Sequence, residues 1–359
     1  MQNVKRRGLG LLVRWTVARN PLHESIMRGA FLRFTMSISE QASVRLYASN
    51  GYNGPILGCG LRYCGTENQA KPTPAQLSRS SVPDEDSLRR MLRMLLLFSV
   101  VAYIALVALA LLSDRIIFRP HPSSYRLSDL AASSSVQPLI LTSGQVSISA
   151  VYLPNVSARY TLLFSHGNAE DLGDDLPMLN ELRRAGFALF AYDYRGYGTS
   201  HGFSSEKSLY EDVDAAYEYL TRTLHVSRDR IISFGRSLGC AAAIHLAATR
   251  SVAGLIVEAP FLSAFRVFTH VRLLPWEKFD NAAYIRRVHR PVLVIHGRSD
   301  RVVPWWHGER IYELANEPKQ YLWVDRAGHN DVLTFASRRY FAAINDFAGL
   351  LDSNQQALR

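Results

Sequence analysis

The chain has 359 residues, of which 48% are hydrophobic, so it can form one large domain with appendages or two domains. Its formal net charge of +10 is uneven, because residues 1–90 contain 13 Lys/Arg and 6 Asp/Glu while the remainder is nearly balanced. This distribution argues against nucleic-acid binding and favours a basic leader beside a membrane. The three cysteines, Cys59, Cys64 and Cys240, do not indicate a disulfide framework. Cys59 and Cys64 also lack the spacing and the histidines of a zinc site, so no metal site is expected.

Residues 1–90 form a leader with little periodic pattern and a polar Ser/Pro/Gln stretch at 71–87. Such a composition is typical of segments that bury too little apolar surface to fold. Three interpretations stay open for this leader: a disordered segment, a targeting segment, or a spurious stretch from an over-long gene model.

Residues 91–112 are expected to cross a membrane once. Residues 94–112 contain no charged side chain, and a helix of these 19 residues rises about 28 Å, which spans the hydrocarbon core of a bilayer. A buried core helix is the alternative, but one so uniformly apolar is uncommon. The arginines before the segment slightly outnumber those after it. This bias favours a cytoplasmic leader, with the C-terminal domain across the membrane.

The rest of the chain predicts a tether at 113–137, an α/β domain at 138–352 and a tail at 353–359. In the domain, short apolar runs alternate with longer amphipathic stretches, as expected for parallel strands joined by right-handed helical crossovers. We therefore expect a mostly parallel, eight-stranded sheet with helices on both faces. The predicted strands lie near 139–142, 146–152, 161–166, 188–193, 230–235, 254–259, 291–296 and 320–325.

Amphipathic helices are predicted between the later strands. Leu176, Leu179 and Leu182 recur at helical spacing in the first of these helices. Before the apolar stripe of the next helix, Ser208 and Glu211 match a capping box, which predicts a helix start at that point.

The pentapeptide Gly235-Arg236-Ser237-Leu238-Gly239 follows a predicted strand and precedes a predicted helix. A G-x-S-x-G motif in this setting is a nucleophile elbow, a sharp turn that exposes the serine hydroxyl. Both flanking residues must be glycine, because side chains there would collide with the neighbouring strand and helix. Ser237 is therefore the predicted nucleophile.

A serine hydroxyl needs a histidine to take its proton and a carboxylate to orient that histidine. In the order typical of this motif, the acid and then the histidine follow the serine. Asp300 and His329 each lie in a loop just after a predicted strand, at the sheet edge where open α/β sheets build their sites. We predict Asp300 as the orienting acid and His329 as the base.

Rival residues for these two roles lie nearby. Asp325, Asp331 and Glu258 are alternative acids, and Asp331 is expected to brace its own loop. His296 precedes the acid in the chain, which breaks the order, so we interpret it as structural.

An oxyanion hole is expected from two backbone N–H groups, those of Leu238 and Asn168. Leu238 directly follows the nucleophile, and Asn168 lies in the loop after the strand near 161–166. His166 at the start of that loop is interpreted as a scaffold residue. The glycine-rich loop at 193–198 lacks the lysine of a phosphate-binding loop, so it is expected to be a rigid turn with Arg195 paired internally.

Five motifs together resemble one group of proteins: HGNAEDLG, AYDYRGYGTS, FGRSLG, PVLVIHGRSD and RAGHNDV, within about residues 153–346. They look like the α/β-hydrolase-domain serine hydrolases that include membrane-associated protein depalmitoylases and their microbial relatives. The resemblance implies an α/β-hydrolase fold and Ser237, Asp300 and His329 as the triad. It also implies action on esters or thioesters, including fatty acyl groups on protein cysteines. Those depalmitoylases are tethered by an acylated cysteine cluster, whereas this chain has an apolar span.

The segment at 260–290 is short, so a minimal lid is expected. Its aromatic residues Phe261, Phe265 and Phe268 either form an apolar wall for an acyl chain or only cover the sheet.

We expect a monomeric, membrane-anchored serine hydrolase that cleaves carboxylic esters or thioesters through an acyl-enzyme and needs no cofactor. A serine peptidase of the same fold and a catalytically silent scaffold stay open as alternatives.

Overall fold

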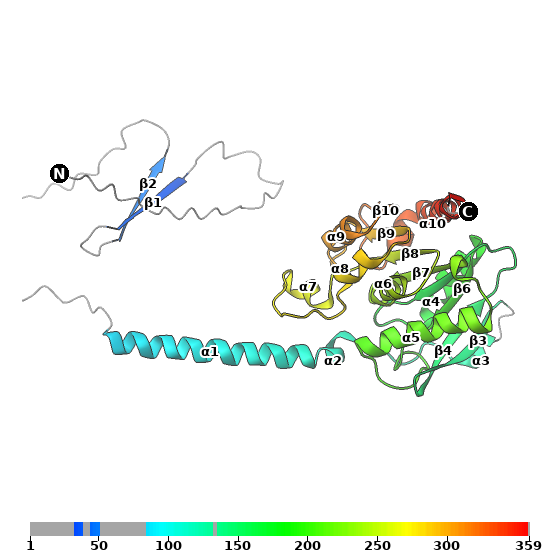
Figure 1. The fold of residues 1–359 in the computed structure, drawn as a ribbon, viewed down its shortest axis with the longest axis horizontal. Coiled ribbons are helices and arrows are strands. Elements are labelled where there is room, and N and C mark those ends of the chain that lie inside the picture. The colour runs from blue at the N-terminus through cyan, green and yellow to red at the C-terminus, as the bar shows by residue number, and fades with distance from the viewer. Residues whose placement is uncertain (1–31, 39–43, 51–83, 132–134, 358–359) are drawn as a thin grey trace, which may run out of the picture. The chain divides into compact units, whose positions relative to one another are not determined.

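The computed structural model describes residues 32–38, 44–50, 84–131 and 135–357 (Figure 1). The chain divides into two units, Met1–Val82 and Pro83–Arg359. In the first unit, strands β1 (Leu32–Ile38) and β2 (Val44–Asn50) form an antiparallel pair. The prediction of a disordered or targeting leader otherwise falls outside the described residues, as do Cys59 and Cys64.

Helix α1 (Glu85–Leu111) opens the second unit and is longer than the predicted span, because six residues precede Met91 in it. Asp84 caps its N-terminus by accepting a hydrogen bond from the Ser87 N–H, at 3.1 Å. Its most apolar 18-residue stretch has a mean hydropathy of 2.8 and is only 6% buried. Among the described residues α1 is the one helix long and apolar enough to cross a bilayer. Its exposure argues against the alternative of a buried core helix.

The main sheet has eight strands in the order β10-β9-β8-β7-β5-β6-β4-β3. All neighbouring pairs are parallel except β3 with β4 and β4 with β6. The prediction of eight mostly parallel strands is thus confirmed, with bounds that differ by one or two residues. The strands are β3 (Gln137–Ser143), β4 (Val146–Leu153), β5 (Thr161–Ser165), β6 (Ala188–Tyr192), β7 (Ile231–Arg236), β8 (Gly254–Glu258), β9 (Val292–Gly297) and β10 (Lys319–Val324).

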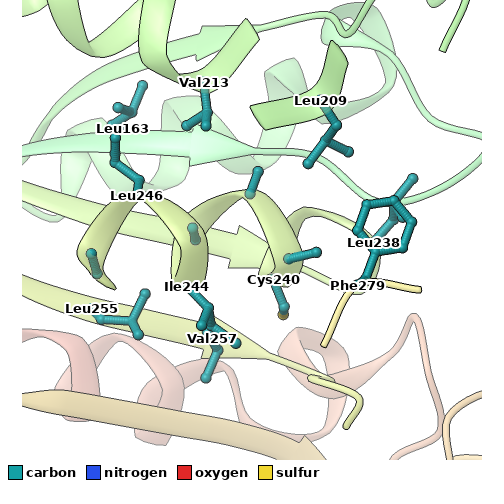
Figure 2. Close-up of a cluster of buried hydrophobic side chains, with 14 of the residues drawn as sticks. Leu163, Leu209, Val213, Leu238, Cys240, Ile244, Leu246, Leu255, Val257 and Phe279 are labelled. Atoms are coloured by element: carbon teal, nitrogen blue, oxygen red, sulfur yellow. The ribbon is translucent and has the colours of Figure 1, made fainter. Parts of the chain in front are cut away.

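Helices cover both faces of this sheet because successive side chains of a strand point to opposite sides. On β8, for example, Leu255 and Val257 belong to one core cluster and Ile256 belongs to the other. The first cluster includes α5 (Glu206–Glu218), α6 (Gly239–Thr249) and α9 (Trp306–Leu314). The second includes α4 (Leu172–Arg184) and α10 (Val332–Ala357). Figure 2 shows the first cluster, in which Cys240 and Ile244 of α6 lie among side chains of the sheet and α5.

Helix α5 begins earlier than the sequence analysis predicts. Its capping box is formed by Ser205, whose hydroxyl accepts from the Ser208 N–H, and by Ser208, whose hydroxyl accepts from the Ser205 N–H. The predicted box of Ser208 with Glu211 is therefore wrong by one turn. A serine at N3 makes the reciprocal bond here, and Glu211 is free to pair with Arg195.

The segment at 113–137, predicted as a tether, is packed against the domain. It contains the short helices α2 (Asp114–Ile117) and α3 (Leu127–Ala131). Phe118, Tyr125 and Leu130 are buried in the core clusters, and the Phe118 ring lies edge-on to Tyr197 and Phe279. A few large apolar side chains within a Ser-rich stretch thus fix this connection. At the other end, α10 continues through most of the predicted tail at 353–359.

The lid region contains α7 (Ala264–Thr269), α8 (Asn281–Tyr284) and a 3₁₀ turn, η4 (Ile285–Arg287). The π-turn η2 (Tyr219–Thr223) follows α5, and the 3₁₀ turn η3 (Arg228–Arg230) leads into β7. No large cap domain is inserted between β8 and β9, so the C-terminal edge of the sheet remains accessible at the site described below.

Candidate active site

Ser237 sits on the sharp turn between β7 and α6. Its φ of +50° is in the left-handed region that non-glycine residues rarely adopt. A Cβ on Gly235 would overlap the carbonyl oxygen of Gly239, and one on Gly239 would overlap that of Ser165. Both glycines are therefore required by close backbone approach, as the motif predicts.

The structure brings the three predicted side chains together at the C-terminal edge of the sheet. Ser237 follows β7, Asp300 follows β9 and His329 follows β10. His329 Nε2 lies 2.8 Å from the Ser237 Oγ, and its Nδ1 lies 2.7 Å from Asp300 Oδ2. Because an ionised carboxylate only accepts, Nδ1 carries the proton and Nε2 is free to accept from the serine hydroxyl. This arrangement can transfer a proton from serine to histidine during nucleophilic attack.

Asp300 is held in its charged form by its surroundings. Its Oδ1 accepts hydrogen bonds from the N–H groups of Val302 and Val303, at 2.8 and 2.9 Å. Burial opposes the charge, but hydrogen bonds from His296 and His329 outweigh it and keep the carboxyl pKa well below its usual value. An acid that stays ionised can orient an imidazole and stabilise its protonated form.

His296 lies behind this acid, fully buried, where the sequence analysis predicts a structural role. Its Nε2 lies 2.9 Å from the Val303 carbonyl oxygen and 3.3 Å from Asp300 Oδ2. Because a carbonyl oxygen only accepts, Nε2 carries a proton, and this N–H faces both acceptors. His296 therefore braces the loop that carries Asp300 and does not reach Ser237.

The rival acids are engaged elsewhere. Glu258 is buried and accepts a hydrogen bond from the Tyr340 hydroxyl at 2.6 Å. Asp331 accepts from the Gly328 N–H at 2.5 Å, which braces the His329 loop as predicted. Asp325 is exposed and pairs with Arg298 at 3.2 Å. None of the three is hydrogen-bonded to His329, which leaves Asp300 as its partner.

The loop after β5 carries Asn168 and lines a cleft that Ser237 and His329 also line. The Asn168 side chain is held by three contacts: its Oδ1 accepts from the Tyr197 hydroxyl at 2.6 Å and from the Arg119 N–H at 3.0 Å, and its Nδ2 donates to the Ile117 carbonyl at 2.6 Å. Leu238, directly after Ser237, lines the cleft as well. The segment after the apolar helix is thus hydrogen-bonded to the loop predicted to supply an oxyanion donor.

Arg236 is a feature that the sequence analysis missed. Its guanidinium forms ion pairs with Glu170 and with Asp175, the latter at 3.2 Å, and Glu170 Oε2 accepts from the Gly167 N–H at 2.8 Å. Burial raises the Glu170 pKa, but the Arg236 charge outweighs this effect and the pKa lies below its usual value. Burial raises the Asp175 pKa well above its usual value, as does the nearby Glu170 charge. Arg236 and its two carboxyl partners therefore connect the elbow to the loop of Asn168.

A signal for this contact was present in the sequence. Arg236 places a charge at the end of an otherwise apolar strand, and such a charge needs a partner when it is buried. Its partners lie 61 to 66 positions earlier in the chain, and sequence spacing cannot specify such a pairing.

His166 is buried at the base of the loop and stacks on Tyr194, with ring centroids 4.0 Å apart. Its Nδ1 donates to the Gly167 carbonyl at 2.7 Å, and burial lowers its pKa to about 4. Its Nε2 lies 3.6 Å from Asp193 Oδ1, and burial raises the pKa of Asp193 to about 7. His166 is thus neutral at physiological pH and serves as a scaffold residue. Arg195, as predicted, is paired internally, with Asp212 at 2.8 Å and Glu211 at 2.7 Å.

The cleft that Ser237 and His329 line has a volume of about 500 Å³, and apolar side chains form part of its lining, the apolar wall. Of the three aromatic residues predicted to form this wall, Phe261 and Phe268 line the cleft. Phe265 instead lines an adjacent cavity. Ile116 and Ile117 of α2 also line the cleft. The sequence analysis did not expect this contribution, because it predicted a tether at these residues.

Comparisons with known proteins agree with this architecture. A family model described as "Serine aminopeptidase, S33" matches residues 156–281. An esterase of Pyrococcus furiosus superposes with a TM-score of 0.55 at 17% identity, covering 65% of this chain and 97% of the esterase. The chain has the α/β-hydrolase fold.

Two curated relatives are similar in sequence. One is alpha/beta hydrolase domain-containing protein aho-3 of Caenorhabditis elegans, 40% identical over 58% of this chain and 61% of the relative. Another is human alpha/beta hydrolase domain-containing protein 17C, 41% identical over 53% of this chain and 58% of the relative. The chain thus spans about three fifths of the length of the curated relatives it matches.

Proposed function

We propose that this α/β-hydrolase is a membrane-anchored serine hydrolase that cleaves carboxylic esters or thioesters through an acyl-enzyme. The observation that carries the proposal is the unbroken hydrogen-bonded series Ser237–His329–Asp300 at the rim of an apolar cleft. A serine, a histidine and an ionised carboxylate in this geometry are the groups that acyl transfer requires.

The proposed reaction has two halves. Ser237 Oγ attacks the acyl carbonyl while His329 Nε2 takes its proton, and Asp300 stabilises the imidazolium. The N–H groups of Asn168 and Leu238 stabilise the negative oxygen of the tetrahedral intermediate. His329 then protonates the departing alcohol or thiol, leaving the acyl group on Ser237. A water molecule, deprotonated by His329, releases the acid and regenerates the hydroxyl. None of these steps uses a cofactor.

Membrane anchoring is proposed for α1. Its length and mean hydropathy fit a single span, and its apolar side chains are exposed. Because α2 packs on the domain and lines the cleft, the anchor would hold the active site close to the bilayer surface. A membrane-resident acyl ester or thioester is therefore the favoured substrate class.

A fluorophosphonate probe tests the catalytic proposal directly. Such probes react with activated serines, so the full-length protein should become labelled, and Ser237→Ala should not. Ser233→Ala is a matched control, since that serine is buried on β7 and donates to the Ala243 carbonyl at 3.1 Å. Equal, weak labelling of all three proteins would support a catalytically silent scaffold instead.

A serine peptidase is the second candidate, favoured by the description of the matching family model. A free acidic group in the cleft would favour binding of a peptide substrate's α-ammonium group through opposite charge. Among the described residues that line the cleft, Glu170 is the one acidic residue, and it is already bound to Arg236 and to the Gly167 N–H. We therefore expect hydrolysis of acyl esters and thioesters to exceed hydrolysis of aminoacyl anilides, and the reverse order would favour the peptidase.

A further inference from the structure

A second cavity, of about 260 Å³, lies between the end of α1 and the lid segment. Leu106, Leu109, Ala110 and Ser113 line it from one face of α1 and the turn that follows, because residues three and four apart share a face of a helix. On the other side it is lined by residues of α7 and the loop after it, among them Phe265, Phe268 and Leu274, so the helix predicted to be an anchor forms part of this cavity.

The polar groups of this cavity are already engaged. The Ser113 hydroxyl donates to the Ala110 carbonyl at 2.6 Å, and the Thr269 hydroxyl donates to the Phe265 carbonyl at 3.0 Å. Glu277 accepts from Arg266 and from the Ser263 hydroxyl, each at 2.7 Å. The remaining lining is hydrocarbon. A ligand of this cavity would therefore be held by apolar contact, with no polar group of its own inside.

The cavity adjoins the catalytic cleft. Ile116, Ile117, Ala264 and Phe268 line both spaces, so the cavity begins where the apolar wall of the cleft ends. Phe268 at this boundary is 77% exposed and is not fixed by packing. A hydrocarbon chain whose carbonyl lies at Ser237 would extend along this wall toward α1.

The position of the cavity on α1 places it at the depth of the bilayer. Leu106 lies six residues before Leu112, the end of the uncharged run, which corresponds to about 9 Å along the helix axis. The lid segment lies beside these last turns. Its exposed apolar side chains, Val271 and Leu273, would contact lipid at the depth typical of interfacial segments.

We propose that the end of α1 and the α7 segment form an acyl-chain channel, open to the bilayer, that admits the hydrocarbon chain of a membrane-resident ester or thioester to Ser237. The inference rests on the proposed function and adds the source and path of the substrate. The anchor helix is then part of the substrate-binding site as well as an attachment. A lipid chain that occupies the cavity without being substrate is the alternative occupant, and the experiments below separate the two.

Leu109→Trp tests the channel by filling it. The full-length protein is reconstituted in phosphatidylcholine vesicles, and kcat/KM is measured for hexadecanoyl and butanoyl esters of 4-nitrophenol. Displacing about two methylenes of the longer chain should lower its kcat/KM about tenfold, with the butanoyl value changed by less than about twofold. Leu111→Trp is the matched control, because Leu111 is 71% exposed on the opposite face of α1 and does not line the cavity.

The outcomes separate this inference from the proposed function. If a short fluorophosphonate does not label the wild type, or if the wild type turns over neither ester, the result would count against the serine-hydrolase proposal itself. The channel alone would be overturned by a different result. In that case labelling and butanoyl turnover are normal, and hexadecanoyl turnover is unaffected in both Leu109→Trp and Leu111→Trp. That second result is also the one expected for a bound structural lipid.

Photocrosslinking of the wild-type protein tests the channel without requiring that a variant folds. A long-chain alkyl fluorophosphonate with a terminal photoreactive diazirine first labels Ser237 in vesicles and is then illuminated. Crosslinks to peptides containing residues 106–116 or 264–274 are expected, since these segments line the cavity. Crosslinks confined to other parts of the protein or to phospholipid would overturn the channel.

Discussion

The wall of the cleft that carries Ser237 and the wall formed by α2 and α7 are built from different interactions. The first, the polar wall, is fixed by hydrogen bonds and largely buried charges: Asp300 accepts from four groups, and Arg236 joins the elbow to the Asn168 loop. The second consists mainly of apolar side chains, and Phe268 on it is largely exposed.

Because the two walls are built differently, we expect them to control different properties of the protein. Bond making needs reacting groups held close to their required positions, and buried polar contacts have the directional geometry to do this. Binding of a hydrocarbon depends mainly on the area removed from water, which is non-directional and tolerates movement. Changes in the polar wall should therefore alter rate and stability, and changes in the apolar wall should alter the preference for chain length.

The largest effect is expected for Asp300→Asn. An amide at this position would leave His329 in the wrong tautomer, so kcat should fall about 10⁴-fold with little change in KM. Steady-state kinetics with a short-chain ester measures it. Asp325→Asn is the control, since that exposed carboxylate pairs only with Arg298 among the described residues. A fall of similar size in the control would contradict the assignment of Asp300.

Arg236→Met should have the next largest effect, on stability. Removing the guanidinium takes the cation away from two largely buried carboxyl groups, Glu170 and Asp175, which should lower the free energy of unfolding by about 3–5 kcal/mol. Urea unfolding followed by tryptophan fluorescence measures the loss. Arg298→Met, which breaks a mostly exposed pair, should cost less than about 1 kcal/mol. Equal losses would mean that the buried cluster does not stabilise the polar wall.

His166 should make the stability of the folded protein fall as the pH becomes acidic. Its pKa is about 4 in the folded protein and about 6.5 when unfolded, so the unfolded chain binds the proton first as the pH falls. Its contribution to stability is thus complete above pH 6.5 and is lost as the pH falls toward 4, by about 3 kcal/mol in all. His166→Gln should show a smaller fall in melting temperature between these pH values. Parallel curves for the two proteins would rule out this role.

The smallest effect is expected on the apolar wall. Phe268→Ala removes an exposed ring that lines both the cleft and the adjoining cavity, so the melting temperature should not change. The kcat/KM for a long-chain ester should fall about tenfold, while that for an acetate ester stays constant. Phe203→Ala is the control, because that ring is 92% exposed and lines neither space. An equal loss on both esters would indicate that Phe268 acts on the chemistry.

The sequence predicted the regular part of the molecule well, because the signals there are local. Apolar runs located each strand of the main sheet within one or two residues, and G-x-S-x-G predicted a turn whose glycines are required by close packing. The order of serine, acid and histidine identified three side chains that the fold brings together. Their catalytic roles stay predictions until the experiments above are done.

Other features depended on tertiary contacts that no local pattern contains. The tether prediction followed a Ser-rich composition, yet Phe118 and Tyr125 dock on the domain. The helix start at Ser205 depended on a reciprocal hydrogen bond that the sequence analysis assigned to the next turn.

The strands, the elbow and an apolar helix of membrane-spanning length could be predicted from neighbouring residues, since periodicity, steric demands and hydropathy act over short stretches of chain. Two other features could not be predicted in this way: Arg236 pairs with Glu170, and α1 shares a cavity with α7. Both outcomes depend on how distant segments pack, and packing is settled by the shape and charge of surfaces that exist only after the chain has folded.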